Sequence, residues 1–364
     1  MKKEAKFTVL LLAAVFLGFS VWCWINPSKE YSETERRKLS QFPKLRIETV
    51  VEGKFMTEFE KYSLDQFPMR DQFRSLKAWV SGNILRKSDN NDIYMADGYA
   101  VKMEYPLNEE SIENAGNKFW KVYENYLKGA RDNIYVSLIP DKNYFLADSS
   151  GHLSMDYDLF FDKMQKEMSY AKFVEIRDLL SIEDYYKTDV HWRQENIVDI
   201  ADRIGSAMGI TFSKEFEQKE LEKEFYGVYF GQSALNLPGE RLYYLTNDVL
   251  EQCVVYNYES NQSKGIYDFE KAAGDDLYEI FLSGPVSLMK IENPNAATEK
   301  ELIVFRDSFG SSLVPLLAEG YQSIVLVDIR YIQSEFLSNF VDFTDKDVLF
   351  LYSTVVLNHS ETLK

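Results

Sequence analysis

Continuous apolar runs separated by amphipathic segments mark the C-terminal part of the chain. The runs at 301–305, 323–329 and 348–352 read as strands, and helical spacing follows the first of them at 312–317. Strands that are apolar on both faces are typical of a parallel sheet covered by helices on both sides. The pattern predicts an α/β sandwich with a twisted, mainly parallel sheet, to which a further strand at 134–139 belongs.

The preceding regions show other periodicities. Aromatic residues between 47 and 87 recur every three to four positions, which predicts helices, and Pro68 predicts a break among them. Alternation over 91–103 around Asp97-Gly98 predicts a β-hairpin. Residues 214–298 are irregular, aromatic and rich in turn residues, and we interpret them as an insertion or large loops around the sheet.

An uncharged apolar stretch of 19 residues occupies positions 7–25, after three lysines. About 20 apolar residues span a bilayer, and basic residues stay on its cytoplasmic side. We expect a cytoplasmic tail at 1–6, a transmembrane signal-anchor at 7–25 and an extracytoplasmic C-terminal part. The alternative is a cleaved signal peptide, whose apolar core is usually about 7–15 residues with small residues at the cut. The exit Trp22-Cys23-Trp24 lacks such residues.

The rest divides into a stalk and helical preface at 26–90, expected to pack on the sheet, and an α/β domain at 91–364. The 364 residues are 45% hydrophobic, which excludes a wholly disordered chain. A net charge of −17 argues against nucleic acid as a partner and against attraction to anionic lipid, so membrane attachment must be hydrophobic. Of two cysteines, Cys23 lies in the anchor, so no intrachain disulfide is expected with Cys253.

Two strings carry candidate chemistry. His191, one of three histidines, follows Asp189 in a TDVHW string, and Ser308 lies in an RDSFG string after a strand. A histidine can activate a serine while an aspartate holds its tautomer, and open α/β sheets bind ligands where their strands end. Each signal also has a structural reading: Ser308 and Asp307 as helix-cap or turn residues, and Trp192 as core packing. Scattered histidines without metal-ligand spacing predict no metal site.

Taken together, the sequence resembles the DHHW family of bacterial envelope proteins, which are relatives of the alginate O-acetyltransferase branch of SGNH hydrolase-like proteins. The resemblance covers nearly the whole chain after the anchor. It rests on strings in the same order, which are ETERR at 33–37 with Phe42-Pro43, DQFPMRD at 65–71, TDVHW at 188–192, Phe225-Tyr226-Gly227, RDSFG at 306–310 and VDIRY at 327–331.

This resemblance implies a three-layer, SGNH-hydrolase-like (flavodoxin-like) fold with a permuted motif order, in which the Asp-x-His motif precedes the serine. It implies Ser308 as nucleophile, His191 as base and Asp189 as orienting acid. Two departures stand out: Val190 replaces the family's second histidine, and Arg306 replaces the glycine of the usual Gly-Asp-Ser string.

Supporting residues are harder to assign from the resemblance. Arg306 could crowd the turn of the nucleophile or bind substrate. Gly284 is a candidate for the oxyanion hole, and Arg330 is a candidate for substrate binding.

The function that the resemblance implies is an extracytoplasmic O-acetyltransferase, or an acetylesterase, acting on a cell-envelope or exopolysaccharide at the cell membrane. The expected partners are the membrane, the polysaccharide acceptor and a multispanning membrane O-acyltransferase that supplies the acyl group. No cofactor is expected. The alternative is a non-catalytic envelope protein of the same fold that binds or helps to assemble surface polysaccharide.

Overall fold

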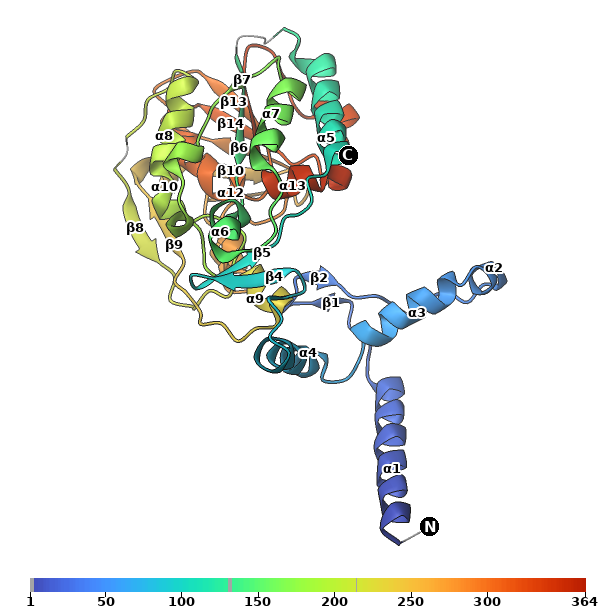
Figure 1. The fold of residues 1–364 in the computed structure, drawn as a ribbon. Coiled ribbons are helices and arrows are strands. Elements are labelled where there is room, and N and C mark those ends of the chain that lie inside the picture. Colours follow the sequence, from blue (N-terminus) through green and yellow to red (C-terminus); the bar gives the residue numbers. More distant parts are fainter. Residues whose placement is uncertain (1–2, 130–132, 214) are drawn as a thin grey trace. The chain divides into compact units, whose positions relative to one another are not determined.

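The computed structural model describes residues 3–129, 133–213 and 215–364 and divides into two compact units (Figure 1). The first comprises Met1–Asn91 with Phe230–Asn236, and the second comprises Asp92–Tyr229 with Leu237–Lys364. The 3₁₀- and π-helical turns are labelled η. The first unit contains α1 Lys3–Ile25, β1 Tyr31–Ser32, β2 Arg37–Lys38, α2 Ile47–Val51, α3 Lys54–Asp65, α4 Arg70–Trp79, η1 Val80–Ile84 and β3 Asp89–Asn90.

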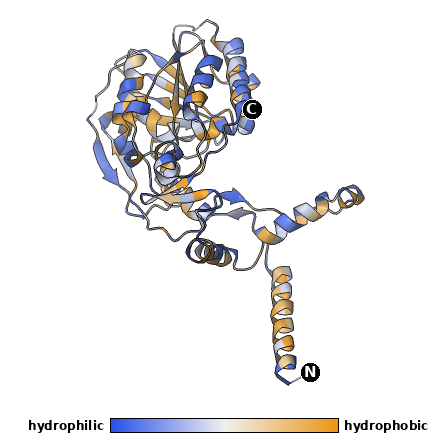
Figure 2. Ribbon diagram, viewed as in Figure 1, coloured by the Kyte–Doolittle hydropathy of each residue, from blue (hydrophilic) through white to orange (hydrophobic). Residues whose placement is uncertain are grey.

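Helix α1 is the only helix among the described residues that is long and apolar enough to cross a membrane. Its residues are hydrophobic along most of its length (Figure 2), and none of them is buried. After it, α3 ends at Asp65 and α4 begins at Arg70, so the helical run is interrupted at Pro68 as predicted.

The second unit is built on an eight-stranded sheet of order β11-β10-β12-β14-β13-β15-β6-β7. The five strands from β14 to β7 are parallel, and β12, β10 and β11 continue the sheet in antiparallel fashion. Its strands are β6 Ile134–Ile139, β7 Lys172–Phe173, β10 Val254–Asn257, β11 Gln262–Lys264, β12 Leu288–Glu292, β13 Glu301–Arg306, β14 Ser323–Val327 and β15 Asp347–Ser353. The expected α/β fold with a mainly parallel sheet is confirmed.

Helices and two antiparallel strand pairs accompany this sheet, and the last four residues of the helix at 228–233 belong to the first unit. The helices are α5 Glu109–Val122, η2 Tyr123–Leu127, α6 Lys142–Ser150, α7 Tyr157–Glu167, η4 Arg177–Leu179, η5 Ile182–Asp184, η6 Gln194–Asn196, α8 Val198–Ala207, α9 Val228–Ser233, α10 Asp248–Gln252, α11 Phe269–Ala272, η7 Leu277–Ile280, α12 Gly310–Leu313, η8 Val314–Gly320, η9 Ser334–Asn339, α13 Thr354–Asn358 and η10 Ser360–Thr362. The paired strands are β4 Ile93–Ala96 with β5 Tyr99–Lys102, and β8 Glu217–Glu220 with β9 Tyr243–Thr246.

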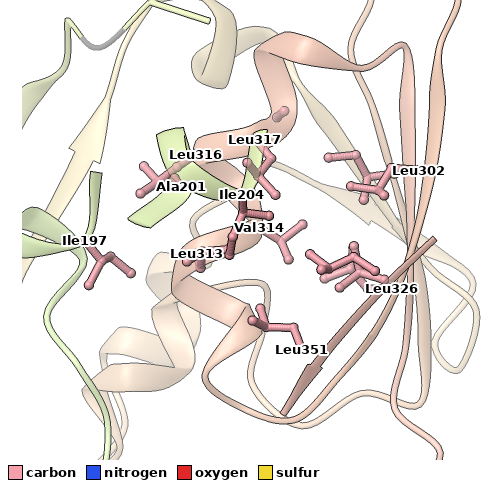
Figure 3. Packing of buried hydrophobic residues seen from close by; sticks show 14 of the residues in the cluster. Ile197, Ala201, Ile204, Leu302, Leu313, Val314, Leu316, Leu317, Leu326 and Leu351 are labelled. Carbon is pink, nitrogen blue, oxygen red and sulfur yellow. The ribbon is translucent and has the colours of Figure 1, made fainter. Parts of the chain in front are cut away.

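Two apolar layers enclose the sheet, because alternate residues of its strands face opposite sides. Leu302 and Val304 of β13 belong to one buried cluster, and Ile303 and Phe305 belong to the other. Figure 3 shows the first layer, in which α8 and the α12–η8 segment place their apolar side chains against Leu302, Leu326 and Leu351 of the strands. The helix that follows Ser308 is therefore fixed to the sheet by its core face.

Of two further local predictions, one is confirmed and the other is wrong. The hairpin at Asp97-Gly98 is present, with both turn residues at positive φ. Residues 254–292 differ from the expected loops, since they supply β10, β11 and β12 to the main sheet. β10 and β11 are short and partly exposed, and Lys290 and Glu292 interrupt the apolar residues of β12, so all three lack the continuous apolar runs by which the central strands are recognised.

Candidate active site

Ser308 lies in a tight turn at the carboxyl end of β13. The preceding Asp307 is fully buried and accepts hydrogen bonds at both oxygens. Its Oδ1 accepts from the Phe309 backbone N at 3.0 Å, and its Oδ2 accepts from the backbone N and Oγ of Ser353, each at 2.7 Å. Because Ser353 ends β15, the neighbour of β13, this carboxylate ties the turn to two strands and fixes the position of Ser308.

A loop from far earlier in the chain brings His191 to this turn. His191 Nε2 lies 2.7 Å from Ser308 Oγ, and His191 Nδ1 lies 2.5 Å from Asp189 Oδ1. An ionised carboxylate only accepts hydrogen bonds, so Nδ1 carries the proton and Nε2 is left to accept from the hydroxyl. Asp189 is fully buried, the side chain of His191 is 11% exposed, and Ser308 is half-buried. The three residues form one hydrogen-bonded series that ends at the surface.

The second oxygen of Asp189 is held by the backbone at the start of α9. The Val228 N–H donates to Asp189 Oδ2 at 2.7 Å, and the Gly227 N–H donates to Thr188 Oγ1 at 2.9 Å. A Cβ on Gly227 would lie 2.4 Å from the Asp189 Cα, far inside van der Waals contact. Glycine is required here because two backbone segments meet at this point.

Aromatic rings cover the imidazole of His191. Tyr278 stacks on it with ring centroids 3.8 Å apart and planes 5° apart, and Phe309 packs against it at 5.0 Å. The Tyr278 hydroxyl lies 2.8 Å from Ser312 Oγ, and burial raises the pKa of Tyr278 well above its usual value. The tyrosine therefore stays neutral and acts as a fixed wall beside the base.

Lys142 supports the loop that carries Asp189. Its Nζ donates to the carbonyl oxygens of Tyr186 at 2.9 Å and Lys187 at 3.2 Å, and it lies 5.0 Å from the ring centroid of Tyr229. Burial lowers the pKa of Lys142 to about 7. The amine is buried at the start of α6, directly after β6, so it links the aspartate loop to the sheet.

The two candidate arginines lie near the site without reaching toward it. Arg306 is 1% exposed, and its Nη1 donates to Asp307 O and Ser311 Oγ beneath the turn. Arg330 forms a two-point ion pair with Asp328, at 2.9 Å through Nε and 2.6 Å through Nη2. Through these contacts Arg306 braces the turn and Arg330 pairs with Asp328, and a role of either in substrate binding stays a prediction.

Trp192 and Gly284 also have structural partners. Trp192 is fully buried, and its Nε1 donates to Phe309 O at 3.1 Å and Ser312 Oγ at 2.9 Å, so it braces the serine turn. Gly284 adopts positive φ, and its N–H donates to Phe281 O at 3.3 Å. That N–H is thus used within its own turn, and a role of Gly284 in an oxyanion hole stays a prediction. Over the described ranges, no group of three His, Cys, Asp or Glu residues could hold a metal ion.

Sequence reasoning did not identify Tyr278, Lys142 or Val228 as supporting residues. Tyr278 and Lys142 belong to no sequence motif that indicates a functional role. Val228 contributes a backbone group, which has no side-chain signature. The adjacent Gly227 did carry a signal, since it belongs to the Phe225-Tyr226-Gly227 string. Its steric role became visible only when Asp189 was placed beside it.

Comparisons with known proteins address the fold. No family model and no curated protein matches this sequence. Among solved structures, a DHHW family protein from Eubacterium siraeum matches with a TM-score of 0.60 at 18% identity, over 75% of this chain and 95% of that one. The chain has the fold of a DHHW family protein. The resemblance indicated by the motifs is therefore confirmed at the level of the fold.

Two further matches are a Bacillus protein and a Pseudomonas protein. PatB1 of Bacillus cereus, in a structure that carries a sulfonyl adduct, matches with a TM-score of 0.58 at 20% identity, over 73% of this chain and 95% of that one. The O-acetyltransferase domain of Pseudomonas putida AlgJ matches with a TM-score of 0.44 at 9% identity, over 73% of this chain and 92% of that one. The latter likeness is too weak to carry an argument.

Proposed function

We propose that this protein is an extracytoplasmic O-acetyltransferase, or an acetylesterase, that modifies a cell-envelope or exopolysaccharide. The observation that carries the proposal is the hydrogen-bonded series from Asp189 through His191 to Ser308, with the serine at the carboxyl end of a central strand. Nucleophile, base and orienting carboxylate in this order are the arrangement used for acyl transfer on several unrelated folds.

In the first half-reaction, Ser308 Oγ attacks the carbonyl carbon of an acetyl donor while His191 Nε2 takes the hydroxyl proton. The tetrahedral intermediate then collapses, the bond to the donor's leaving group breaks, and that group receives the proton from His191. Asp189 stabilises the imidazolium that exists between these steps and keeps the proton of Nδ1 in place. The product is an acetyl ester on Ser308.

In the second half-reaction, a sugar hydroxyl gives its proton to His191 Nε2 and attacks the acetyl ester. Collapse releases O-acetylated sugar and returns the proton to Ser308 Oγ. Water in place of the sugar gives acetate, so transfer and hydrolysis share the same residues and differ in how well the bound acceptor excludes water.

A structure of PatB1, whose fold is similar, carries a sulfonyl adduct. In this proposal the reactive group of the present chain is Ser308. The partial exposure of Ser308 is compatible with a polymer as acceptor, because a polysaccharide cannot enter a closed cavity.

Location and partners follow from α1 in this proposal. An uncleaved α1 would hold the protein at the cell membrane as a single-pass anchor, with the larger unit outside. One span cannot carry an acetyl group across the bilayer. A multispanning membrane O-acyltransferase would therefore have to supply the acyl group from the cytoplasmic side.

The test uses the full-length protein in detergent with p-nitrophenyl acetate, followed by intact mass and by release of p-nitrophenol. Wild type should form an acetyl adduct or turn over, and Ser308→Ala should do neither. Ser260→Ala, a change at an exposed serine, is the matched control and should behave as wild type.

Addition of an oligosaccharide acceptor separates the two reactions, because acetyl recovered on sugar indicates transfer and acetate alone indicates hydrolysis. Equal labelling of wild type and Ser308→Ala would contradict the proposed nucleophile. Silence from both, even with the acceptor and a membrane fraction from the producing cells, would favour the non-catalytic polysaccharide-binding alternative.

A further inference from the structure

Exposed apolar side chains are concentrated in one short part of the first unit. Fourteen large apolar side chains are exposed over residues 42–85, compared with eleven over the described residues of 92–364. Several lie on α3 and α4, such as Met56, Leu64, Phe73 and Leu76. Soluble proteins rarely expose apolar side chains at this density unless another apolar phase covers them.

These helices meet α1 well inside its apolar stretch. Phe67 stacks on Phe19 of α1 with ring centroids 5.9 Å apart, and Phe73 lies edge-on to Phe19 at 6.2 Å. Phe19 is six residues before the end of α1 at Ile25, which corresponds to about 9 Å along the helix axis. If α1 spans a membrane, the segment between α3 and α4 lies deeper in the bilayer than the point at which α1 leaves the bilayer. Amphipathic helices at interfaces place their apolar face about 5–10 Å deep, which matches this position.

The charge of this part of the chain is opposite to that of the remainder. Residues 26–87 carry 13 Lys and Arg against 9 Asp and Glu, whereas residues 88–364 carry 25 against 48. The average over the whole chain, which is strongly acidic, therefore hides a basic segment directly after the anchor. Basic residues beside an apolar surface favour contact with anionic headgroups.

An internal ion cluster holds α3 and α4 in place. The buried carboxylate of Glu35 pairs with Arg70 at 2.6 Å and with Arg74 at 2.9 Å. Asp65, at the end of α3, forms a two-point pair with Arg37, whose guanidinium keeps the pKa of Asp65 well below its usual value. Glu35 and Asp65 are thus paired within the unit, while Phe73 and Leu76 of α4 stay exposed.

We propose that residues 42–85 form a second membrane contact, in which apolar side chains of α3 and α4 enter the outer leaflet beside α1 and exposed lysines meet anionic headgroups. The inference rests on the proposed membrane anchor α1, and it is independent of the acyl-transfer chemistry. The occupant of this surface is lipid, and a protein partner on the same surface is an outcome that the experiment separates.

The experiment places a nitroxide spin label on the full-length chain in vesicles that contain no other protein. In a Cys23→Ala background, Leu76→Cys tests the surface and Phe336→Cys is the matched control, since the two side chains are 54% and 53% exposed. Cys253 is buried and should remain unlabelled. The measured quantity is the accessibility of each label to oxygen, which partitions into lipid, relative to a water-soluble nickel chelate.

The label at position 76 should show a several-fold higher oxygen-to-nickel ratio than the label at position 336, in vesicles of phosphatidylcholine with phosphatidylglycerol. Equal ratios at both positions would overturn the proposal and leave the surface for a protein partner. Extraction by alkaline carbonate reports separately on α1. If carbonate extracts the protein and the label at position 76 is exposed to water, both the membrane anchor and the second membrane contact are contradicted. If the protein resists extraction and the label is exposed to water, only the second membrane contact is contradicted.

A charge variant tests the role of the lysines without altering the apolar face. Lys61 and Lys77 are exposed on α3 and α4. Lys61→Glu combined with Lys77→Glu should lower the ratio at position 76 in vesicles with phosphatidylglycerol and leave it unchanged in pure phosphatidylcholine. An equal effect in both lipids would overturn the electrostatic part of the proposal.

Discussion

Two histidines in the larger unit each face a buried carboxylate, but their surroundings differ. His191 pairs with Asp189 and also reaches Ser308, under a stacked Tyr278. His359 Nε2 lies 3.0 Å from Glu104 Oε2, its side chain is 53% exposed, and the structure gives its ring no hydroxyl partner among the described residues. A histidine–carboxylate pair is thus not a site by itself. The third group, and the rings that hold the imidazole, make the difference.

Replacing each carboxylate by an amide should give the largest difference in activity between the His191–Asp189 pair and the His359–Glu104 pair. Asp189→Asn lets the amide donate to His191 Nδ1, which leaves the proton on Nε2, so the ring can no longer accept from Ser308. We expect kcat to fall by about 10⁴-fold. Glu104→Gln, the same change at His359, should leave kcat within a small factor of wild type. Turnover of an acetyl ester by both full-length variants is the measurement, and an Asn variant that retained most of its activity would contradict the proposed roles.

The close approach at Gly227 offers a second contrast. Gly227→Ala places a Cβ 2.4 Å from the Asp189 Cα, so one backbone segment must move. We expect a loss of about 1–3 kcal/mol in the free energy of unfolding, together with reduced kcat because Asp189 is displaced. Gly265→Ala is the matched control, since a Cβ there meets nothing within 4 Å. Urea unfolding of both variants measures the difference, and equal stability would indicate that the loop adapts.

Loss of the Tyr278 ring, which stacks on His191, should reduce kcat less than the changes above. Tyr278→Leu removes the stack, and we expect kcat to fall about fivefold, which corresponds to about 1 kcal/mol of lost ring contact. Tyr278→Phe keeps the ring and loses only the hydrogen bond to Ser312. It should retain kcat while losing about 1 kcal/mol of stability. If the Phe and Leu variants lost equal activity, the hydroxyl and not the stacked ring would be the important group.

The smallest expected effect concerns His359. Its hydrogen bond to Glu104 raises the pKa of the imidazole above its usual value. The pairing therefore stabilises the fold fully below the unfolded pKa of about 6.5, and the contribution is lost as pH rises through the higher folded pKa. His359→Gln should be less stable than wild type by about 0.5 kcal/mol at low pH, because exposed pairs are weak. Unfolding at pH 5 and pH 9 checks the sign, and a larger difference at pH 9 would contradict it.

The central strands of the sheet can be predicted from the sequence alone. The apolar runs that became β13, β14 and β15 identify buried strands because both of their faces must be covered. The antiparallel strands β10 to β12 could not be predicted in this way, since they are short, their apolar residues are interrupted by polar ones, and they pair through backbone groups that any side chain permits. Arg306 shows the converse limit, because neither its burial nor its contacts with Asp307 and Ser311 could be predicted from a basic residue beside the nucleophile.

The sequence by itself determined the apolar N-terminal helix, the sheet class and three residues with the right chemistry, because hydrophobic periodicity and side-chain type are local properties. The family resemblance implied that His191 serves Ser308, but only the tertiary structure brings the two side chains to 2.7 Å, since 117 residues separate them and no local rule links them. It also decided which neighbours hold these groups. Tyr278, Lys142 and the Val228 N–H act through distances that exist only after the chain has folded.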